Sequence, residues 1–176
     1  MFRLALCALL ASLAIHTAHA EELRFKQRLL DDLVQQVPDI LKTYDATTGR
    51  FGRGIWICND QQAMWPLAVA YATRAAGDSA NRYDHDPKLL EVIVKAGDAL
   101  IADMNPKGQW VFRKKDGSTW GDIHMPWTSS RWIRTFGLIR EQMPPEARKR
   151  WSDALTLGYT GIAASGLNHI HNLPTH

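Results

Sequence analysis

Cysteine is scarce in this sequence, which has two in 176 residues, Cys7 and Cys58. Cys7 lies in an N-terminal segment that we expect to be removed, so Cys58 has no partner for an internal disulfide. The rest of the chain must therefore be held together by its hydrophobic core. About 150 residues are enough to build one domain in this way.

Runs of like charge are also missing. The formal net charge of +3 is spread along the chain, and no basic run or RNA-binding motif stands out, which argues against a nucleic-acid-binding protein. The metal-binding spacings HExxH and CxxC are absent as well. We therefore expect no nucleic-acid partner and no cofactor.

The first residues have the pattern of a secretory signal peptide. Arg3 gives a basic start, an apolar run covers residues 4–15, and a small-x-small cleavage sequence, Ala-His-Ala, ends at Ala20. The apolar run is too short to span a bilayer comfortably. We expect residues 1–20 to be cleaved off and residues 21–176 to be exported to the periplasm or the extracellular space, without a membrane span.

The apolar periodicity predicts five helices joined by loops of unequal length. Proline supports several of the boundaries, because Asp86-Pro87 is a cap followed by a first-turn proline and Pro144-Pro145 separates the last two helices. Asp60 is expected to cap the second helix. The predicted helices cover residues 23–44, 60–77, 87–104, 126–143 and 145–165.

The sequence around Asp116-Gly117 carries the one convincing strand signal. Short runs with strand-forming residues flank this tight-turn dipeptide, which predicts a β-hairpin within residues 108–123. The hairpin falls in one of three long loops, and because these loops follow alternate helices, they should share one rim of the fold. The three loops cover residues 45–60, 105–125 and 166–176.

These loops gather aromatic, amide and histidine side chains, which is typical of a functional surface. Several tryptophans in the loops of an exported protein favour flat ligands such as sugar rings, although each could equally pack in the core. The candidate rim residues are Trp56, Asn59, Trp110, Trp120, His124 and Trp127, together with the stretch NHIHN at 168–172.

Alternating helices, long loops on one rim, a signal peptide and rim tryptophans together resemble the (α/α) toroid enzymes that act on polysaccharides. The nearest group is the uronate-polysaccharide lyases, the alginate-lyase and heparinase-like enzymes. The stretch NHIHN is similar to the Asn/His segments that such lyases place at the start of an inner helix. This resemblance covers residues 23–176 and implies an all-α fold of antiparallel helical hairpins that form part of an (α/α) toroid, with one small β-hairpin in a rim loop.

A complete toroid needs more helices than the five predicted here. The stretch NLPTH at the C-terminus also places proline in a helix-opening position. We therefore expect residues 21–176 to form the N-terminal part of a toroid domain that is truncated at its C-terminus. Such a fragment alone is not expected to be an active enzyme.

The resemblance implies β-elimination from a uronate-containing polysaccharide. This reaction removes a proton next to a carboxylate, whose charge must be neutralised as the enolate forms, and it needs a base that works near neutral pH. Asparagine amides suit the first task, histidine suits the second, and arginine binds carboxylates; no catalytic tyrosine is identifiable. The candidate catalytic residues are Asn59, Asn168, His169 and His171, and the candidate substrate-binding residues are Trp56, Trp110, Trp120, Trp127, Arg131, Arg134 and Asn172.

Three other functions stay open. A glycoside hydrolase needs two carboxylates, for which Asp60 and Asp122 are candidates. A zinc site could use His169 and His171, which His176 with His124 or Cys58 would complete; calcium is the other possible metal. A non-catalytic carbohydrate-binding protein would need only the tryptophans. The favoured prediction is a secreted or periplasmic lyase whose partner is an acidic polysaccharide or oligosaccharide.

Overall fold

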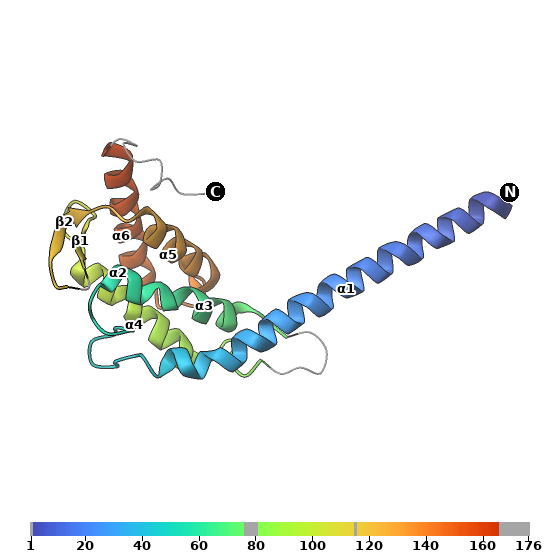
Figure 1. Cartoon of the computed structure of the whole chain (residues 1–176), viewed down its shortest axis with the longest axis horizontal. Coiled ribbons are helices and arrows are strands. Elements are labelled where there is room, and N and C mark those ends of the chain that lie inside the picture. The colour runs from blue at the N-terminus through green and yellow to red at the C-terminus, as the bar shows by residue number, and fades with distance from the viewer. Residues whose placement is uncertain (1, 76–80, 115, 166–176) are drawn as a thin grey trace.

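The computed structural model describes residues 2–75, 81–114 and 116–165, with side chains from residue 21 onward. Helices make up most of these ranges, and the sheet found there has two antiparallel strands. The predicted helical fold with a small β-hairpin is therefore confirmed. The elements are α1 (Phe2–Leu41), α2 (Ile57–Asp60), the 3₁₀ helix η1 (Gln61–Ala63), α3 (Met64–Ala72), α4 (Pro87–Asp103), β1 (Trp110–Arg113), β2 (Thr119–Ile123), α5 (Pro126–Ile139) and α6 (Pro145–Ala164) (Figure 1).

Helix α3 is central to the packing. It contacts α1, α4 and α5, while α6 packs against α4 and α5. Helix α1 extends away from this group, with only its C-terminal part against the other helices (Figure 1). The core between the helices contains fully buried aliphatic side chains such as Leu67, Ile93 and Leu100.

Three buried tryptophans connect the hairpin to the last two helices. The ring of Trp132 in α5 lies 6.5 Å from that of Trp110 in β1 and 5.6 Å from that of Trp151 in α6, edge to face in both pairs. All three are fully or nearly fully buried. Edge-to-face pairs of this kind add stability beyond the area they bury, so this cluster fixes where the hairpin sits on the helices.

Helix α4 begins and ends as its sequence predicts. The Asp86 carboxylate accepts the backbone N–H of Lys88 at 3.0 Å, and Pro87 occupies the first turn. The helix ends at Asp103, where Met104 turns extended. Its buried face is formed by small and aliphatic residues at helical spacing, namely Leu89, Ile93, Ala96, Gly97 and Leu100.

The β-hairpin also forms where the sequence predicts it. Trp110 pairs with Ile123, Val111 with Asp122 and Arg113 with Thr119, with a register irregularity between Val111 and Arg113. Gly117 has a φ of 83°, which suits the turn. The backbone N–H of Ser118 binds the Asp116 carboxylate at 2.9 Å.

The second predicted helix differs most from expectation. Asp60 does not cap it; its carboxylate instead accepts the N–H of Gly54 at 3.1 Å, which stabilises the preceding loop. The helix is divided into α2, η1 and α3, and α3 ends at Ala72 rather than near residue 77. The Asn81 amide donates to the carbonyls of Ala70 and Thr73, at 2.6 and 2.8 Å, and so satisfies carbonyls at that end.

Two other helix boundaries move. Helix α1 ends at Leu41, a turn earlier than predicted, and it continues without interruption from Phe2 through the expected cleavage position. Helix α5 ends at Ile139 rather than near Met143. The remaining predicted residues form a turn, in which the Met143 N–H donates to the Ile139 carbonyl at 3.2 Å.

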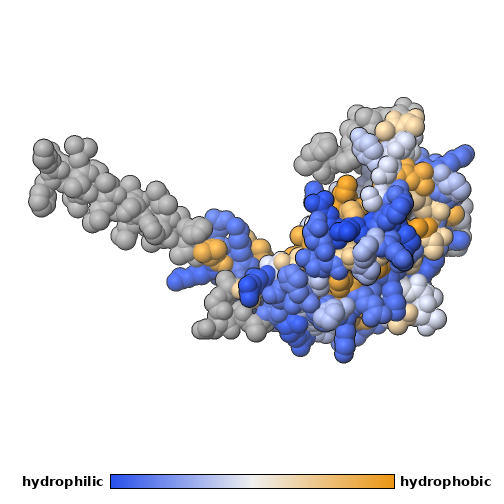
Figure 2. Space-filling view, turned by 180° about the vertical axis from the view of Figure 1, so that it is seen from behind, coloured by the Kyte–Doolittle hydropathy of each residue, from blue (hydrophilic) through white to orange (hydrophobic). Residues whose placement is uncertain are grey.

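The described part of α1 carries exposed apolar side chains. Leu23, Phe25 and Leu29 are each about half exposed, and Figure 2 shows apolar atoms on the surface of this part of the helix. Most of the other surface in that view is hydrophilic, with smaller apolar patches. In the ranges that the structure describes, none of the helices combines the length and the apolar character that crossing a bilayer requires.

Candidate functional site

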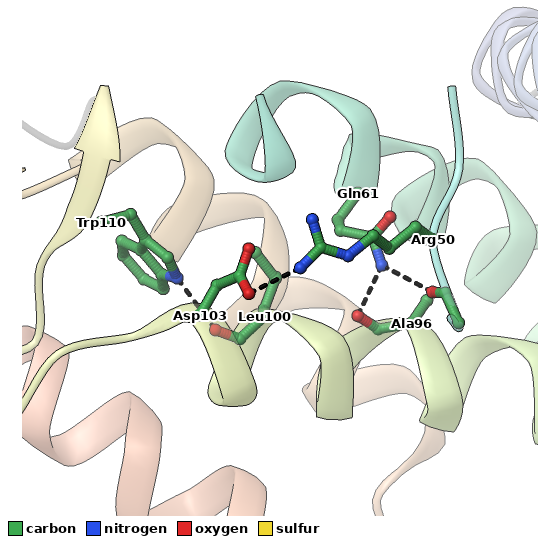
Figure 3. Close-up of polar contacts among 7 residues, drawn as sticks. Arg50, Gln61, Ala96, Leu100, Asp103 and Trp110 are labelled. Atoms are coloured by element: carbon green, nitrogen blue, oxygen red, sulfur yellow. Dashed lines mark hydrogen bonds and ion pairs between the residues drawn. The ribbon is translucent and has the colours of Figure 1, made fainter. Parts of the chain in front are cut away.

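The long loop that follows α1 is attached to α4 by one buried side chain, Gln61. Its amide nitrogen donates to the carbonyls of Gly49 and Ala96, at 2.9 and 2.7 Å (Figure 3). Its amide oxygen accepts the N–H of Phe51 at 2.9 Å. Gln61 is 1% exposed. Because buried amide groups are costly to leave unpaired, this set of bonds holds the loop in one position.

The same loop and the hairpin meet at the C-terminal end of α4. Arg50 of the loop forms a 2.6 Å ion pair with Asp103, the last residue of α4. The indole N–H of Trp110 in β1 donates to the carbonyl of Leu100 at 2.9 Å. Both contacts are drawn in Figure 3. Two of the three loops expected to share a rim therefore lie together, and the third lies outside the described residues.

Three aromatic rings from this loop and the hairpin form a continuous series, which we call the aromatic rim: Trp56, Phe112 and Trp120. The Trp56 and Phe112 ring centroids are 4.4 Å apart, and Phe112 stacks on Trp120 at 4.7 Å with planes 16° apart. Trp120 is 68% exposed. The Lys114 ammonium lies 5.3 Å from the Trp120 ring centroid. Trp56 is tilted by 48° against Phe112, so the exposed part of the aromatic rim is the Trp120 ring, which lies beside a positive charge.

A cleft lies between the same two segments, and we call it the arginine cleft. It holds about 230 Å³. Its lining includes Arg50, Ile55, Trp56, Asp103, Val111 and Arg113. Its charged groups therefore come from the loop, from the end of α4 and from β1, and apolar groups of Ile55, Trp56 and Val111 lie between them.

Helix α5 places further predicted residues beside α2. The hydroxyl of Thr128 donates to the carbonyl of Cys58 at 3.3 Å, and the guanidinium of Arg131 binds the side-chain oxygen of Gln62. Asn59 is exposed on α2. Three predicted residues on α5 are also exposed: Trp127, Arg131 and Arg134.

A hydrogen-bonded chain runs beneath the hairpin on the side of α6. The Asn105 side-chain oxygen accepts the backbone N–H groups of Lys107 and Gln109, at 2.9 and 3.0 Å. Its amide nitrogen therefore faces acceptors, the side-chain oxygens of Gln109 and Asp122, both at 3.2 Å. A backbone N–H can only donate, so the two N–H groups fix which end of the Asn105 amide is its oxygen. The Asn105 nitrogen in turn fixes the orientation of the Gln109 amide.

This chain ends on His124. The Gln109 amide nitrogen lies 3.4 Å from Nε2 of His124, and Nδ1 lies 3.2 Å from the carbonyl oxygen of Gly108. The network therefore assigns a neutral imidazole with its proton on Nδ1. Gly161 of α6 lies against the imidazole, and a β-carbon there would overlap Cε1. His124 thus connects the hairpin to α6.

The structure corrects the prediction for Trp110. It is 1% exposed, so its ring faces are covered by the core and are not open to a sugar. Cys58 is fully buried, and burial raises the pKa of its thiol. A buried, protonated thiol is a poor nucleophile. Desolvation likewise raises the pKa of Asp60, against the lowering effect of the Gly54 and Trp56 N–H groups.

The proposed histidine site lies outside the described residues. It comprises Asn168, His169, His171 and Asn172, and the hypothetical zinc ligand His176 lies outside them too. Within the ranges that are described, no group of three His, Cys, Asp or Glu side chains could hold a metal ion.

Sequence reasoning missed the arginine cleft and Gln61. Arg113 flanks a turn and has the pattern of a solvated residue, and Arg50 lies in a polar loop. Gln61 is one of two adjacent glutamines, and nothing in the sequence distinguishes the buried one from its neighbour. Phe112 could have been found from the sequence. It lies two residues after Trp110 in the predicted strand, and residues two apart in a strand point to the same face.

Comparisons with protein-family models, with curated proteins and with solved structures found no significant match. The function must therefore be argued from the site itself.

Proposed function

We propose that this protein binds an acidic oligosaccharide along the aromatic rim and the adjoining arginine cleft. The observation that carries the proposal is the Trp120 ring, which is 68% exposed, stacks on Phe112 and lies beside the Lys114 ammonium. A sugar ring presents flat C–H surfaces that pack on an exposed indole. Carboxylates on the same chain are attracted by neighbouring ammonium and guanidinium groups.

The chemistry that we propose for the bound ligand is β-elimination. A base takes the proton next to the uronate carboxylate, the electron pair of that C–H bond forms the new double bond, and the glycosidic oxygen leaves with a proton. In this proposal the exposed amide of Asn59 neutralises the carboxylate and Arg131 and Arg134 bind neighbouring carboxylates. The bases that we propose, His169 or His171, come from the C-terminal segment.

Export is part of the same proposal, because polymeric uronates are encountered outside the cytoplasm. We propose that residues 1–20 are a signal peptide and that the mature chain begins at Glu21. N-terminal sequencing of protein recovered outside the cytoplasm tests this proposal. An intact Met1 on the exported protein would contradict it.

Two measurements test the function: oligosaccharide binding by this chain, and product formation by the natural full-length protein that contains it. Incubation with uronate polymers should produce an unsaturated uronate, seen as increasing ultraviolet absorbance, and uronate oligosaccharides should bind saturably. Trp120→Ala should lose both signals, whereas Tyr159→Ala, which removes an exposed aromatic ring from α6, should keep them. Binding without any absorbing product would leave a carbohydrate-binding protein and contradict the lyase. The absence of both would contradict the whole proposal.

A further inference from the structure

We infer that the arginine cleft is a subsite for one monoanionic substituent of the ligand, a carboxylate or a sulfate ester, separate from the surface on which the sugar stacks. This inference rests on the proposed function, because it specifies what part of an acidic oligosaccharide enters the cleft. It assigns a ligand-binding role to Arg50, Arg113 and Asp103.

The charges in the cleft do not balance. Arg50 is paired with Asp103 at 2.6 Å, and the two side chains are 33% and 34% exposed. Arg113 also lines the cleft, and among the described residues no carboxylate lies within ion-pair distance of it. Two guanidinium groups and one carboxylate leave a single positive charge, which one monoanionic group would neutralise.

The shape of the cleft strengthens that charge. Trp56, Ile57 and Val111 contribute apolar groups beside the two guanidinium groups, and a charge in a recess attracts a counter-ion more strongly than one on an open surface. The guanidinium is planar and matches the two oxygens of a carboxylate or sulfate in a forked contact. The cleft therefore selects an oxyanion by both charge and shape.

The size of the cleft limits what enters it. Its volume of about 230 Å³ is below the range of roughly 300–1,000 Å³ that pockets for whole drug-sized ligands occupy. A charged substituent of a sugar therefore has room in this space, whereas several sugar rings of an oligosaccharide do not. The nearest open aromatic face is that of the aromatic rim, which shares Trp56 with the cleft.

Asp103 acts here as a positioning residue. It does not attract an anion itself, but it holds the Arg50 guanidinium at the cleft through their ion pair (Figure 3). Asp103→Asn should therefore weaken anion binding, although it removes a negative charge from the site. A carboxylate that acted only by repulsion would give the opposite change, so this variant separates orientation from net charge.

The probes are three small sugars added to the full chain: methyl glucuronide, glucose 6-sulfate and the neutral methyl glucoside. The measurement is the shift of backbone amide resonances at Ile55, Ile57 and Val111 during each titration. We expect at least one charged sugar to shift these amides saturably and methyl glucoside to leave them unchanged. The two charged probes distinguish a carboxylate from a sulfate ester. If neither of them shifts these amide resonances, the inference is overturned.

Arg113→Gln is the decisive variant, and Arg53→Gln is its matched control. Arg53 is exposed in the same loop as Arg50, and it is not among the residues that line the cleft. Arg113→Gln should weaken binding of the charged sugar on the order of tenfold or more, as expected for a charge-assisted pair. Arg113→Lys should recover part of it, because the charge returns without the fork. Equal losses in Arg53→Gln and Arg113→Gln would overturn the subsite.

The outcomes also separate this inference from the proposed function. Saturable binding of a charged monosaccharide at the cleft, with no uptake of uronate oligosaccharides, would keep the subsite and contradict the proposed function. Oligosaccharide binding that is lost in Trp120→Ala but unchanged in Arg113→Gln would keep the proposed function and overturn the subsite.

Discussion

Gly97 in α4 lies directly against the indole of Trp151 in α6, so closely that a β-carbon on Gly97 would overlap Cζ2 and Cε2 of the ring. The two helices approach each other through this glycine, and the Trp151 indole N–H reaches the Asp98 carboxylate at 3.2 Å. The contact therefore determines how α6 is seated on α4.

Gly97→Ala should destabilise the protein. Alanine is favoured over glycine in a helix by about 1 kcal/mol, but forcing a methyl group into a filled core costs roughly 1–3 kcal/mol or more. Since the blocked position is a fully buried ring, we expect a net loss of about 2 kcal/mol in the free energy of unfolding, measured with urea. Gly137→Ala in α5, which meets no atom within 4 Å, should gain up to about 1 kcal/mol. Equal changes in the two variants would contradict the close packing.

Replacing Gln61 should loosen the loop that carries Arg50. Gln61→Ala removes three hydrogen bonds and leaves the N–H of Phe51 without its acceptor, for which we expect a loss of roughly 2–4 kcal/mol. Gln36→Ala, at an exposed position on α1, should change stability by less than about 0.5 kcal/mol. Chemical denaturation measures both. A Gln61→Ala protein as stable as Gln36→Ala would show that the buried amide contributes little.

The two hairpin tryptophans Trp110 and Trp120 should respond in opposite ways. Trp110→Ala removes a fully buried ring and should cost about 3–5 kcal/mol of stability. Trp120→Ala removes a ring that is 68% exposed and should alter the melting temperature little while weakening oligosaccharide binding at least tenfold. Thermal melts and binding titrations of the same two preparations give the comparison. Loss of stability in Trp120→Ala similar to that in Trp110→Ala would show that the aromatic rim is structural.

The pKa of Asp60 predicts a specific pH dependence. Desolvation raises this pKa above its usual value of 3.8 in the folded protein, so the folded state holds the proton more tightly than the unfolded state does. The stabilising contribution is present below pH 3.8 and is lost as the pH rises through the raised pKa of the folded protein. Asp60→Asn does not ionise and still offers an oxygen to the Gly54 N–H.

Asp60→Asn should therefore gain stability relative to the natural protein as the pH rises from the acid range towards neutral. The difference should become constant once Asp60 is fully ionised in the folded protein. Unfolding measured across this pH range tests the sign. A relative stability of the variant that falls with rising pH would mean that the N–H donors outweigh desolvation.

Local signals in the sequence were sufficient for several elements. The Asp86-Pro87 pair marked the start of α4, and the turn at Asp116-Gly117 marked the hairpin, because each depends on only a few neighbouring residues. The end of α3 could not be read in this way, since it depends on the amide of Asn81 several residues further along the chain.

The candidate site was predictable only in part. Trp56 and Trp120 are predictable as tryptophans that lie in the long loops. The sequence does not reveal that the Trp110 side chain points into the core, because this depends on the pairing register of the two strands, which is irregular between Val111 and Arg113. Arg50 and Arg113 are far apart in the sequence and meet only because both segments attach to the end of α4. Such pairings arise from tertiary packing, which local patterns do not encode.

The most direct test of the central claim is a calorimetric titration of uronate oligosaccharides into the full chain and into Trp120→Ala. The proposal predicts saturable binding to the natural protein that is weakened at least tenfold in the variant, which is the loss expected when about 1.4 kcal/mol of stacking is removed. Equal affinity in both proteins, or no heat of binding in either, would contradict it.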